Sequence, residues 1–164
     1  MATISFQGKP LHTSGELPAV GSKAPDFSLV NSKLMDVNLA SFAGKKKILN
    51  ILPSLDTPTC ATSTRVFNEK AAHFHNTEVL VISADLPFAQ CRFWEIEGLK
   101  HVTALSTFRS DFADIYGVKL VNSILAGLTA RAVVIIDEND TVIYTQLVDE
   151  LANEPDYEKA LAVL

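Results

Sequence analysis

The stretch ILNILPSLDTPTC, residues 48–60, decides how the surrounding chain folds. Its first five residues form an apolar run with the length of a buried strand. Thr57 and Pro58 follow, and the residues from Ala61 to Phe67 begin a helical pattern. Threonine is a common helix N-cap, and proline suits the first helical position, where its missing N–H costs nothing. The stretch therefore predicts a buried strand, a short loop and a helix that begins at Pro58.

Cys60 falls in the first turn of this predicted helix. Unpaired backbone N–H groups and the positive end of the helix dipole favour the thiolate there, and the thiolate is the nucleophilic form of cysteine. Arg65, slightly more than one turn later, could add a positive charge. A free cysteine is most often a small buried hydrophobe, but the neighbours of Cys60 are polar, which is unusual for a core position. We interpret Cys60 as a candidate reactive thiol, with a structural role as the alternative.

Length and composition restrict the class of protein. A chain of 164 residues suits a single domain, residues 1–164, with a core of its own. Apolar residues make up 48% of the chain and charged residues 20%, which is an ordinary globular mixture. The formal net charge of −5 argues against general binding to nucleic acid or to an anionic membrane, because both reward clustered Lys and Arg. The only basic block, Lys45–Lys47, is expected to be a solvated loop.

Cysteine content and the N-terminus bear on the compartment. No stretch has the length and apolarity of a bilayer span, and the first residues lack the basic and apolar regions of a secretory signal. These features predict a cytoplasmic protein. The two cysteines, Cys60 and Cys91, cannot form the disulfide scaffold of a small secreted domain. In a reducing compartment, such a pair more often serves catalysis.

The remaining elements follow from hydrophobic periodicity and turn residues. A small N-terminal hairpin is expected at Ile4–Phe6 and Leu11–Thr13. Further strands are predicted at 27–30, 48–52, 79–83, 102–105, 131–136 and 142–147. Helices are predicted from Cys60 to about Phe74 and at 88–98, 111–116 and 156–164, whereas 117–129 is expected to be loop. This order predicts an α/β protein with a central mixed sheet flanked by helices, compatible with a thioredoxin-like fold.

The spacing Pro53-x-x-x-Thr57-x-x-Cys60 resembles the active-site motif of peroxiredoxins, and the string from Pro53 to Cys60 resembles that of the bacterial thiol peroxidases. Further segments are similar to the same subfamily, in order and almost end to end: Ser83–Gln90, Leu105–Arg109, Gly127–Ala132 and Glu154–Tyr157. The resemblance implies a thioredoxin-like fold and reduction of hydrogen peroxide and organic hydroperoxides. It also implies a homodimer, thioredoxin as electron donor, and no metal or bound cofactor.

Peroxide reduction at Cys60 would produce a sulfenic acid and release water or an alcohol. Thr57 can offer its hydroxyl to the sulfur and to the peroxide, and Pro53 can shield the site from water. Backbone N–H groups around Thr59 and Cys60 supply oriented donors. Such a site also needs a fixed cation to stabilise the thiolate and the leaving oxygen.

The resemblance assigns this cation to Arg131, at the start of the strand predicted over 131–136. From the residues alone, Arg131 could equally be a strand-end side chain that extends to water. Arg65 and Arg109 are weaker candidates, because surface arginines are common.

The second cysteine departs from the pattern of the subfamily. The resolving cysteine of these enzymes ends an Arg-Phe-Cys string, but this chain has Arg92-Phe93-Trp94 and a cysteine at Cys91 instead. Cys91 and Trp94 share one face of a helix, with Cβ atoms about 5–6 Å apart, whereas a disulfide needs about 3.5–4.5 Å. The resembled subfamily unwinds locally to form its disulfide, so Cys91 is a candidate to resolve the Cys60 sulfenic acid. Reduction of Cys60 by an external thiol is the alternative.

Two other classes of function stay open at this stage. A cysteine-dependent acyl-transfer enzyme would need a histidine as base, but the four histidines are scattered along the chain: His12, His73, His75 and His101. A redox-inactive interaction module could keep the fold and have lost turnover through the change at Trp94.

Overall fold

Strand β5, Lys46–Ile51, lies in the middle of the sheet, and its apolar residues pack on both faces: Leu49 and Ile51 on one and Ile48 on the other. In the computed structural model, which describes residues 1–164, β5 pairs in parallel with β6, Thr77–Ser83. On its other side it pairs antiparallel with β8, Ala132–Ile136. A strand with hydrogen-bonded neighbours on both sides and helices on both faces is buried on both faces, which explains the run of apolar residues at its centre.

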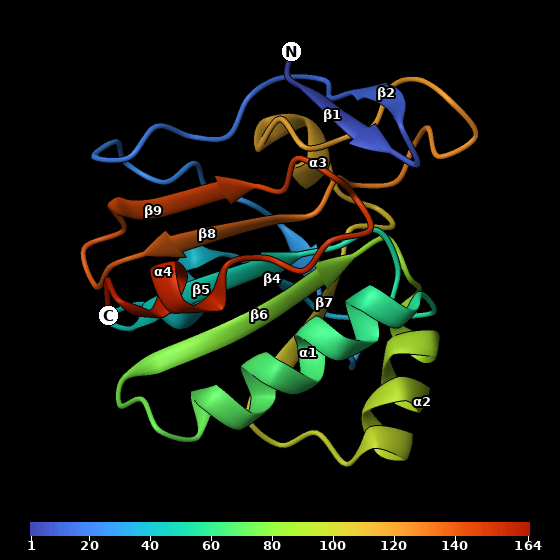
Figure 1. The fold of residues 1–164 in the computed structure, drawn as a ribbon. Coiled ribbons are helices and arrows are strands. Elements are labelled where there is room, and N and C mark those ends of the chain that lie inside the picture. The colour runs from blue at the N-terminus through green and yellow to red at the C-terminus, as the bar shows by residue number, and fades with distance from the viewer.

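Two outer groups of strands complete the sheet. β7, Val102–Ser106, is parallel to β6, and β9, Val142–Leu147, is antiparallel to β8. The short strands β3, Leu29–Val30, and β4, Asp36–Val37, extend the β7 edge. The strand order is β4-β3-β7-β6-β5-β8-β9, and Figure 1 shows the part from β6 through β5 and β8 to β9. A separate antiparallel hairpin is formed by β1, Thr3–Phe6, and β2, Lys9–His12.

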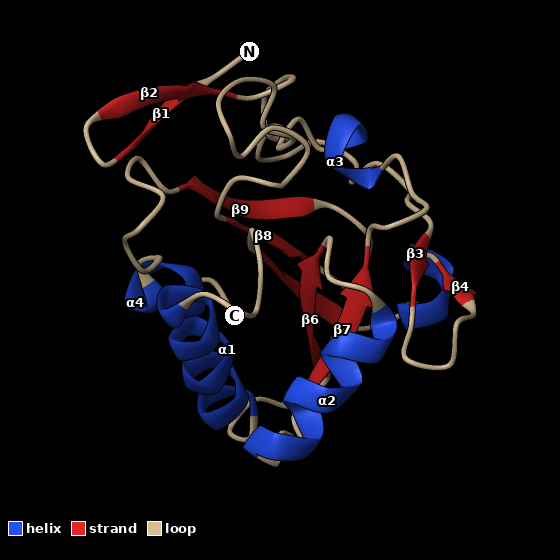
Figure 2. Cartoon of the chain, turned by 90° about the vertical axis from the view of Figure 1, so that its right-hand side faces the viewer, coloured by secondary structure: helices blue, strands red, loops and turns tan.

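Helices cover both faces of this sheet. α1, Pro58–Ala71, α2, Pro87–Glu97, and α4, Tyr157–Leu161, lie on one face, and α3, Phe112–Ile115, lies on the other (Figure 2). The 3₁₀ helix at Leu39–Phe42 also contributes to the α3 side. None of the helices combines the length and the apolarity that a membrane span requires. The prediction of a thioredoxin-like fold with a mixed sheet and an N-terminal hairpin is therefore confirmed.

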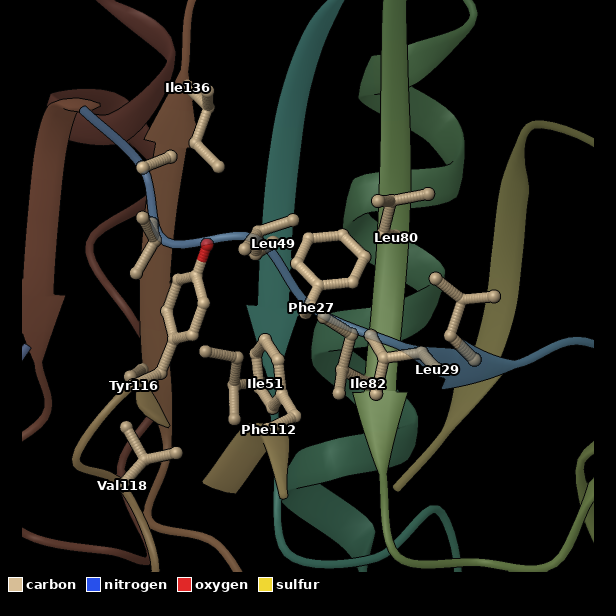
Figure 3. Close-up of a cluster of buried hydrophobic side chains, with 14 of the residues drawn as sticks. Phe27, Leu29, Leu49, Ile51, Leu80, Ile82, Phe112, Tyr116, Val118 and Ile136 are labelled. Atoms are coloured by element: carbon tan, nitrogen blue, oxygen red, sulfur yellow. The ribbon is translucent and has the colours of Figure 1, made fainter. Parts of the chain in front are cut away.

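Each central strand contributes to two separate cores, because successive side chains point to opposite faces. In β6, Leu80 and Ile82 belong to the core on the α3 side, whereas Val79 and Val81 face α1 and α2. Figure 3 shows the first of these cores. Phe112 and Tyr116 stack there with ring centroids 4.5 Å apart, and Phe27 meets Phe112 edge-on.

The buried tyrosine of this core satisfies its own polar group. Tyr116 donates from its hydroxyl to the Pro25 carbonyl at 2.8 Å. Burial raises the pKa of Tyr116, and the nearby carboxylates of Asp26 and Asp140 raise it further. The phenol therefore stays neutral and acts as a hydrogen-bond donor that ties the N-terminal segment to the sheet.

The predicted elements differ from the observed ones mainly at their ends. α1 stops at Ala71, and residues 72–74 continue as turns instead of helix. α2 ends before Gly98, which adopts the left-handed conformation with φ 64° that suits a C-cap glycine. α4 is shorter than the predicted 156–164, and Asp156 caps it by accepting from the Lys159 N–H at 3.1 Å. No helix or strand lies between residues 117 and 129, as predicted.

The expectation of a solvated loop at Lys45–Lys47 is wrong for two of the three lysines. Lys46 and Lys47 belong to β5, and Lys47 is fully buried. Its Nζ lies 2.6 Å from Asp140 Oδ1, in the turn between β8 and β9. The acidic turn at 137–140 therefore supplies the counter-charge. A buried ammonium is stable only with such a partner.

Substitution of Asp140 and substitution of Lys47 should change the free energy of unfolding by different amounts. Asp140→Asn leaves the buried Lys47 ammonium without a counter-charge and should lower the free energy of unfolding by about 3–5 kcal/mol. Asparagine tolerates the positive φ of this position, 61°, so the backbone contributes little. Lys47→Met removes the buried charge and leaves a partly exposed carboxylate, which should cost about 1 kcal/mol or less. Denaturant titration measures both values, and equal losses would contradict this account.

Candidate active site

Cys60 lies in the first turn of α1, as predicted. Thr57 is the N-cap residue with extended backbone, φ −107° and ψ 146°, and Pro58 is the first helical residue. Cys60 is fully buried. The amide N–H groups of Thr59 and Cys60 have no acceptor in the chain, because the first turn of a helix lacks preceding carbonyls. Two free donors and the positive end of the helix dipole therefore lie next to the thiol.

Arg131 contacts this thiol directly. It precedes β8 and lies on the same face as Val133 and Ile135, which is the α1 face of the sheet. One terminal nitrogen, NH1, is 3.2 Å from Cys60 Sγ, and Nε donates to the Leu151 carbonyl at 3.0 Å.

The side chain of Arg131 is only 2% exposed and does not extend to water. This excludes the alternative of a solvent-directed strand end. A guanidinium held at two points, with NH1 aimed at the sulfur, is placed to stabilise negative charge that develops there.

Thr57 and Pro53 lie beside this pair. Thr57 Oγ1 donates to the Ser54 carbonyl at 3.0 Å, and its side chain makes no capping bond. The expectation that this hydroxyl donates to the sulfur and the peroxide therefore needs correction: its proton is engaged, and it meets other groups as an acceptor. Pro53 is buried and lines the same pocket as Thr57.

A pocket of about 280 Å³ opens beside the arginine–cysteine contact. Its polar groups come mainly from Thr57, Thr59 and Arg131. The other walls are largely apolar and come from distant parts of the chain: Phe6, Pro53, Ser54, Pro58, Leu125, Leu128, Leu151 and Ala152. The site therefore combines a few polar groups with an apolar surround, which is the usual make-up of a small-molecule site.

The N-terminal hairpin fixes one wall of this pocket. Ser5 and Gln7, on either side of Phe6, are both tied to Glu150: Ser5 through its hydroxyl and Gln7 through its N–H, the latter at 3.1 Å. The Ser5 N–H also donates to the Asp149 carbonyl at 2.7 Å. These bonds, the Ser5 hydroxyl first, lower the pKa of Glu150. The residues on both sides of Phe6 are thus bonded to the ionised carboxylate of Glu150, which fixes the position of Phe6.

The two weaker arginine candidates lie elsewhere. Arg65 is exposed and forms a two-point pair with Glu97, at 2.8 and 2.7 Å. Arg109 binds Asp36 at 3.0 Å and lies over the Phe108 ring, 5.5 Å from its centroid. Neither arginine contacts Cys60. The expectation that Arg65 adds a positive charge beside the sulfur is therefore not met.

Cys91 lies on α2, away from Cys60. Its Sγ is 3.9 Å from the Ser32 carbonyl, and it lines a different pocket of about 430 Å³ together with Trp94 and Met35. This pocket shares no residue with the one beside Arg131. Both cysteines are free thiols. In this conformation the structure does not bring Cys91 to Cys60.

Asp85 is a site residue that the sequence reasoning missed. Its carboxylate accepts from Ser54 Oγ at 2.7 Å and from the Leu55 N–H at 2.8 Å, and so supports the loop before Cys60. A signal was present: Asp85 follows β6, and the ends of parallel neighbouring strands meet at one edge of the sheet. The carbonyl of Leu151, which holds Arg131, has no sequence signal of its own. No group of three or more His, Cys, Asp or Glu side chains is arranged to hold a metal ion.

Comparisons with known proteins agree with this geometry. The family model described as Redoxin matches residues 19–161. A thiol peroxidase of Corynebacterium glutamicum is 54% identical over 164 residues, covering 100% of this chain and 99% of that protein. The chain belongs to the redoxin family. Within that family its sequence places it with the bacterial thiol peroxidases, which are peroxiredoxin enzymes.

Solved structures of the redoxin family superpose closely on this chain. A peroxiredoxin-like protein from Aquifex aeolicus gives a TM-score of 0.94 at 37% identity, over 99% of this chain and 95% of the other. A thiol peroxidase from Chromobacterium violaceum gives a TM-score of 0.92 at 25% identity, over 99% and 95% of the two chains. The fold is therefore shared with these redoxins along almost its whole length.

The contact between Arg131 and Cys60 predicts a specific loss of reactivity. Arg131→Met should slow the reaction of Cys60 with hydrogen peroxide by about 100-fold or more, since loss of one preorganised donor to developing charge has that effect. Rapid-mixing kinetics of the reduced protein measure the rate constant. Arg65→Met, which removes an exposed guanidinium from α1, is the matched control and should leave the rate unchanged. Similar rates for all three proteins would contradict a role for Arg131.

Proposed function

We propose that this chain reduces hydrogen peroxide and organic hydroperoxides through a sulfenic acid on Cys60. The observation that carries this proposal is the 3.2 Å contact between the buried Arg131 guanidinium and the Cys60 sulfur at a helix N-terminus. In the reaction, the thiolate attacks one peroxide oxygen, the O–O bond breaks, and the other oxygen leaves as water or an alcohol after taking up a proton. Sulfur is oxidised and the peroxide is reduced by two electrons.

Each neighbour of Cys60 has a role in this proposal. Arg131 and the free amides of Thr59 and Cys60 stabilise the thiolate and the charge that develops on the leaving oxygen. Thr57, with its proton given to the Ser54 carbonyl, accepts a hydrogen bond from the O–H of the peroxide and so orients it. Pro53 keeps water from the sulfur.

An acyl-transfer reaction is less well supported by the same geometry. That chemistry needs a general base beside the cysteine. The side chain in contact with Cys60 Sγ is Arg131, and arginine cannot give up its proton in a protein. No histidine makes a hydrogen bond to Cys60.

The apolar lining of the pocket supports organic hydroperoxides as substrates. An alkyl or aryl group would leave water for a surface that includes Phe6, Leu125 and Leu128. Hydrogen peroxide has no such group and would use only the polar contacts. The proposed preference for organic substrates therefore depends on these walls.

Phe6→Ala tests the role of the walls. This change should lower kcat/KM for cumene hydroperoxide about fivefold to tenfold more than kcat/KM for hydrogen peroxide, because only the organic substrate loses apolar contact. Ile124→Ala is the matched control, since Ile124 is 96% exposed and does not line the pocket. Equal losses for the two peroxides would contradict an apolar substrate wall at Phe6.

We further propose that Cys91 resolves the oxidised Cys60. Its thiolate attacks the sulfenic sulfur, hydroxide leaves and is protonated to water, and a Cys60–Cys91 disulfide forms. The step requires α2 to open, because Cys91 lines a pocket that is separate from the pocket beside Arg131 and Cys60. Much of the helix is exposed: only Pro87 and Gln90 are buried, and Phe88 and Ile96 are 70% and 76% exposed. The bond from Trp94 Nε1 to the Val102 carbonyl at 2.9 Å and the surface pair of Glu97 with Arg65 would break on opening. An element with so few buried residues opens at a lower free-energy cost than the core strands.

Thioredoxin is the proposed reductant, a homodimer the proposed assembly and the cytoplasm the proposed location. A dimer is supported by exposed apolar side chains on two neighbouring segments, Leu86 and Phe88 on one and Phe108 on the other. Ser106 connects these segments through its bond to the Asp85 carbonyl at 2.6 Å. Exposed apolar side chains that cluster on a surface are typical of interaction sites.

Peptide-resolved mass spectrometry after one equivalent of peroxide, without added thiol, tests the cycle. The proposal predicts a Cys60–Cys91 crosslink, with loss of two hydrogens, that thioredoxin reduces. Oxygen added to Cys60 with Cys91 still free would instead mean a one-cysteine enzyme reduced from outside. An untouched Cys60 would exclude peroxidase chemistry and leave the chain as a non-catalytic interaction module.

A further inference from the structure

Asp85 does not touch the reacting sulfur, yet its carboxylate collects donors from two parts of the molecule. From the loop before Cys60, Ser54 Oγ donates to Oδ1 at 2.7 Å and the Leu55 N–H donates to Oδ2 at 2.8 Å. From the opposite side, Ser83 Oγ at the end of β6 donates to Oδ2, also at 2.7 Å. Hydrogen bonds to a carboxylate are of the stronger, charge-assisted kind. Asp85 is therefore a firm anchor for the loop.

The same chain of hydrogen bonds continues into α2. Ser83 Oγ accepts from Gln90 Nε2 at 3.2 Å, and this amide nitrogen also donates to the Leu105 carbonyl at 3.0 Å. Because a carbonyl can only accept, the bond to Leu105 fixes which end of the amide faces Ser83. Ser83 and Gln90 are both fully buried. A continuous path of donors thus runs from α2 through Ser83 to Asp85, where it meets the donors of the Cys60 loop.

Gln90 is the buried polar tether of α2, beside the bond from Trp94 Nε1 to the Val102 carbonyl at 2.9 Å and the pair of Glu97 with Arg65. It is one of two buried residues of this helix, and its Oε1 is buried without a hydrogen-bond partner. An unpaired buried acceptor is unfavourable in the folded helix. Opening of α2 would expose this oxygen to water and recover that cost. The residue that follows directly in sequence is Cys91.

At the other end, the path reaches the peroxide pocket. Asp85 holds the Ser54 side chain, and the Ser54 carbonyl accepts the Thr57 hydroxyl at 3.0 Å. Thr57 lines the pocket beside Arg131. Through Ser54, the position of Asp85 therefore determines how the oxygen of the Thr57 hydroxyl is oriented in the pocket.

We propose that Asp85 is a positioning residue that couples the geometry of the Cys60 loop to the folded state of α2, through Ser83 and Gln90. The proposal rests on the peroxidase function argued above. While α2 is folded, the path holds Thr57 in place for attack on the peroxide. When α2 opens to present Cys91, Gln90 leaves Ser83 and the loop loses support from that side. Coupling of this kind is reciprocal, so cutting the path should affect both ends.

Ser83→Ala cuts the path in its middle and leaves both ends intact. In a Cys91→Ser background, where no disulfide can form, two quantities are measured: the rate constant of Cys60 with hydrogen peroxide and amide hydrogen exchange over residues 87–97. We expect α2 exchange to accelerate about tenfold and the peroxide rate to fall about tenfold, the size of effect of one such hydrogen bond. Exchange over α1 is the internal reference and should stay unchanged.

Three further variants sharpen the test. Asp85→Asn should produce the same two changes, with a larger loss of peroxide rate because it also weakens the support of Ser54. Asp56→Asn is the matched control, because it removes an exposed carboxylate from the same loop and should change neither quantity. Gln90→Met removes the donor from the α2 end together with the unpaired Oε1, so it should lower the peroxide rate as Ser83→Ala does but accelerate α2 exchange less. It covers the case in which the strand variant folds poorly.

The outcomes separate this proposal from the function on which it rests. Unchanged α2 exchange in Ser83→Ala would overturn the coupling, even if the peroxide rate fell. Equal acceleration over α1 and α2 would show general destabilisation and would also overturn it. A parent protein that does not react with peroxide would refute the proposed function, whereas the exchange experiment would still report whether Asp85 and α2 are linked.

Discussion

The structure of the site depends on one buried contact, between the guanidinium of Arg131 and the sulfur of Cys60. A charged arginine that is almost fully buried is costly unless an anion and further acceptors surround it. Here the Leu151 carbonyl fixes one side of the guanidinium, and the sulfur at the start of α1 lies against the other. Negative charge that develops on the sulfur during reaction is stabilised by the buried guanidinium, and it lowers the cost of burying Arg131. The same contact that places the arginine therefore activates the cysteine.

This contact arises from the way strands distribute side chains. β8 alternates between the two cores, so Arg131, Val133 and Ile135 all face α1. β5 pairs with β8 and leads directly into the Cys60 loop, which brings two residues separated by 71 positions into contact. At the far end of β5, Lys47 is buried against Asp140. The Lys47–Asp140 ion pair thus lies near the start of the central strand, and the Arg131–Cys60 contact lies beyond its other end.

Local features of the fold could be predicted from the sequence because their causes are local. The Thr57-Pro58 start of α1, the apolar β5 and the N-terminal hairpin all follow from neighbouring residues. Arg131 was found through family resemblance, because from the strand pattern alone it could equally extend to solvent. Contacts across long separations were missed: Asp140 lies 93 positions from Lys47, and Asp85 lies 31 positions from Ser54. The direction of the Thr57 hydroxyl was missed too, because it depends on where the folded loop places the Ser54 carbonyl.

The most direct test of the account is the rate at which a small neutral alkylating agent, iodoacetamide, modifies reduced protein in a Cys91→Ser background, in which Cys60 is the only thiol. The account predicts that Arg131→Met in the same background slows this modification strongly, because the guanidinium 3.2 Å from the sulfur is removed. Arg65→Met should retain the rate of the parent. If the rate were the same with and without Arg131, the central claim that the buried arginine activates Cys60 would be wrong.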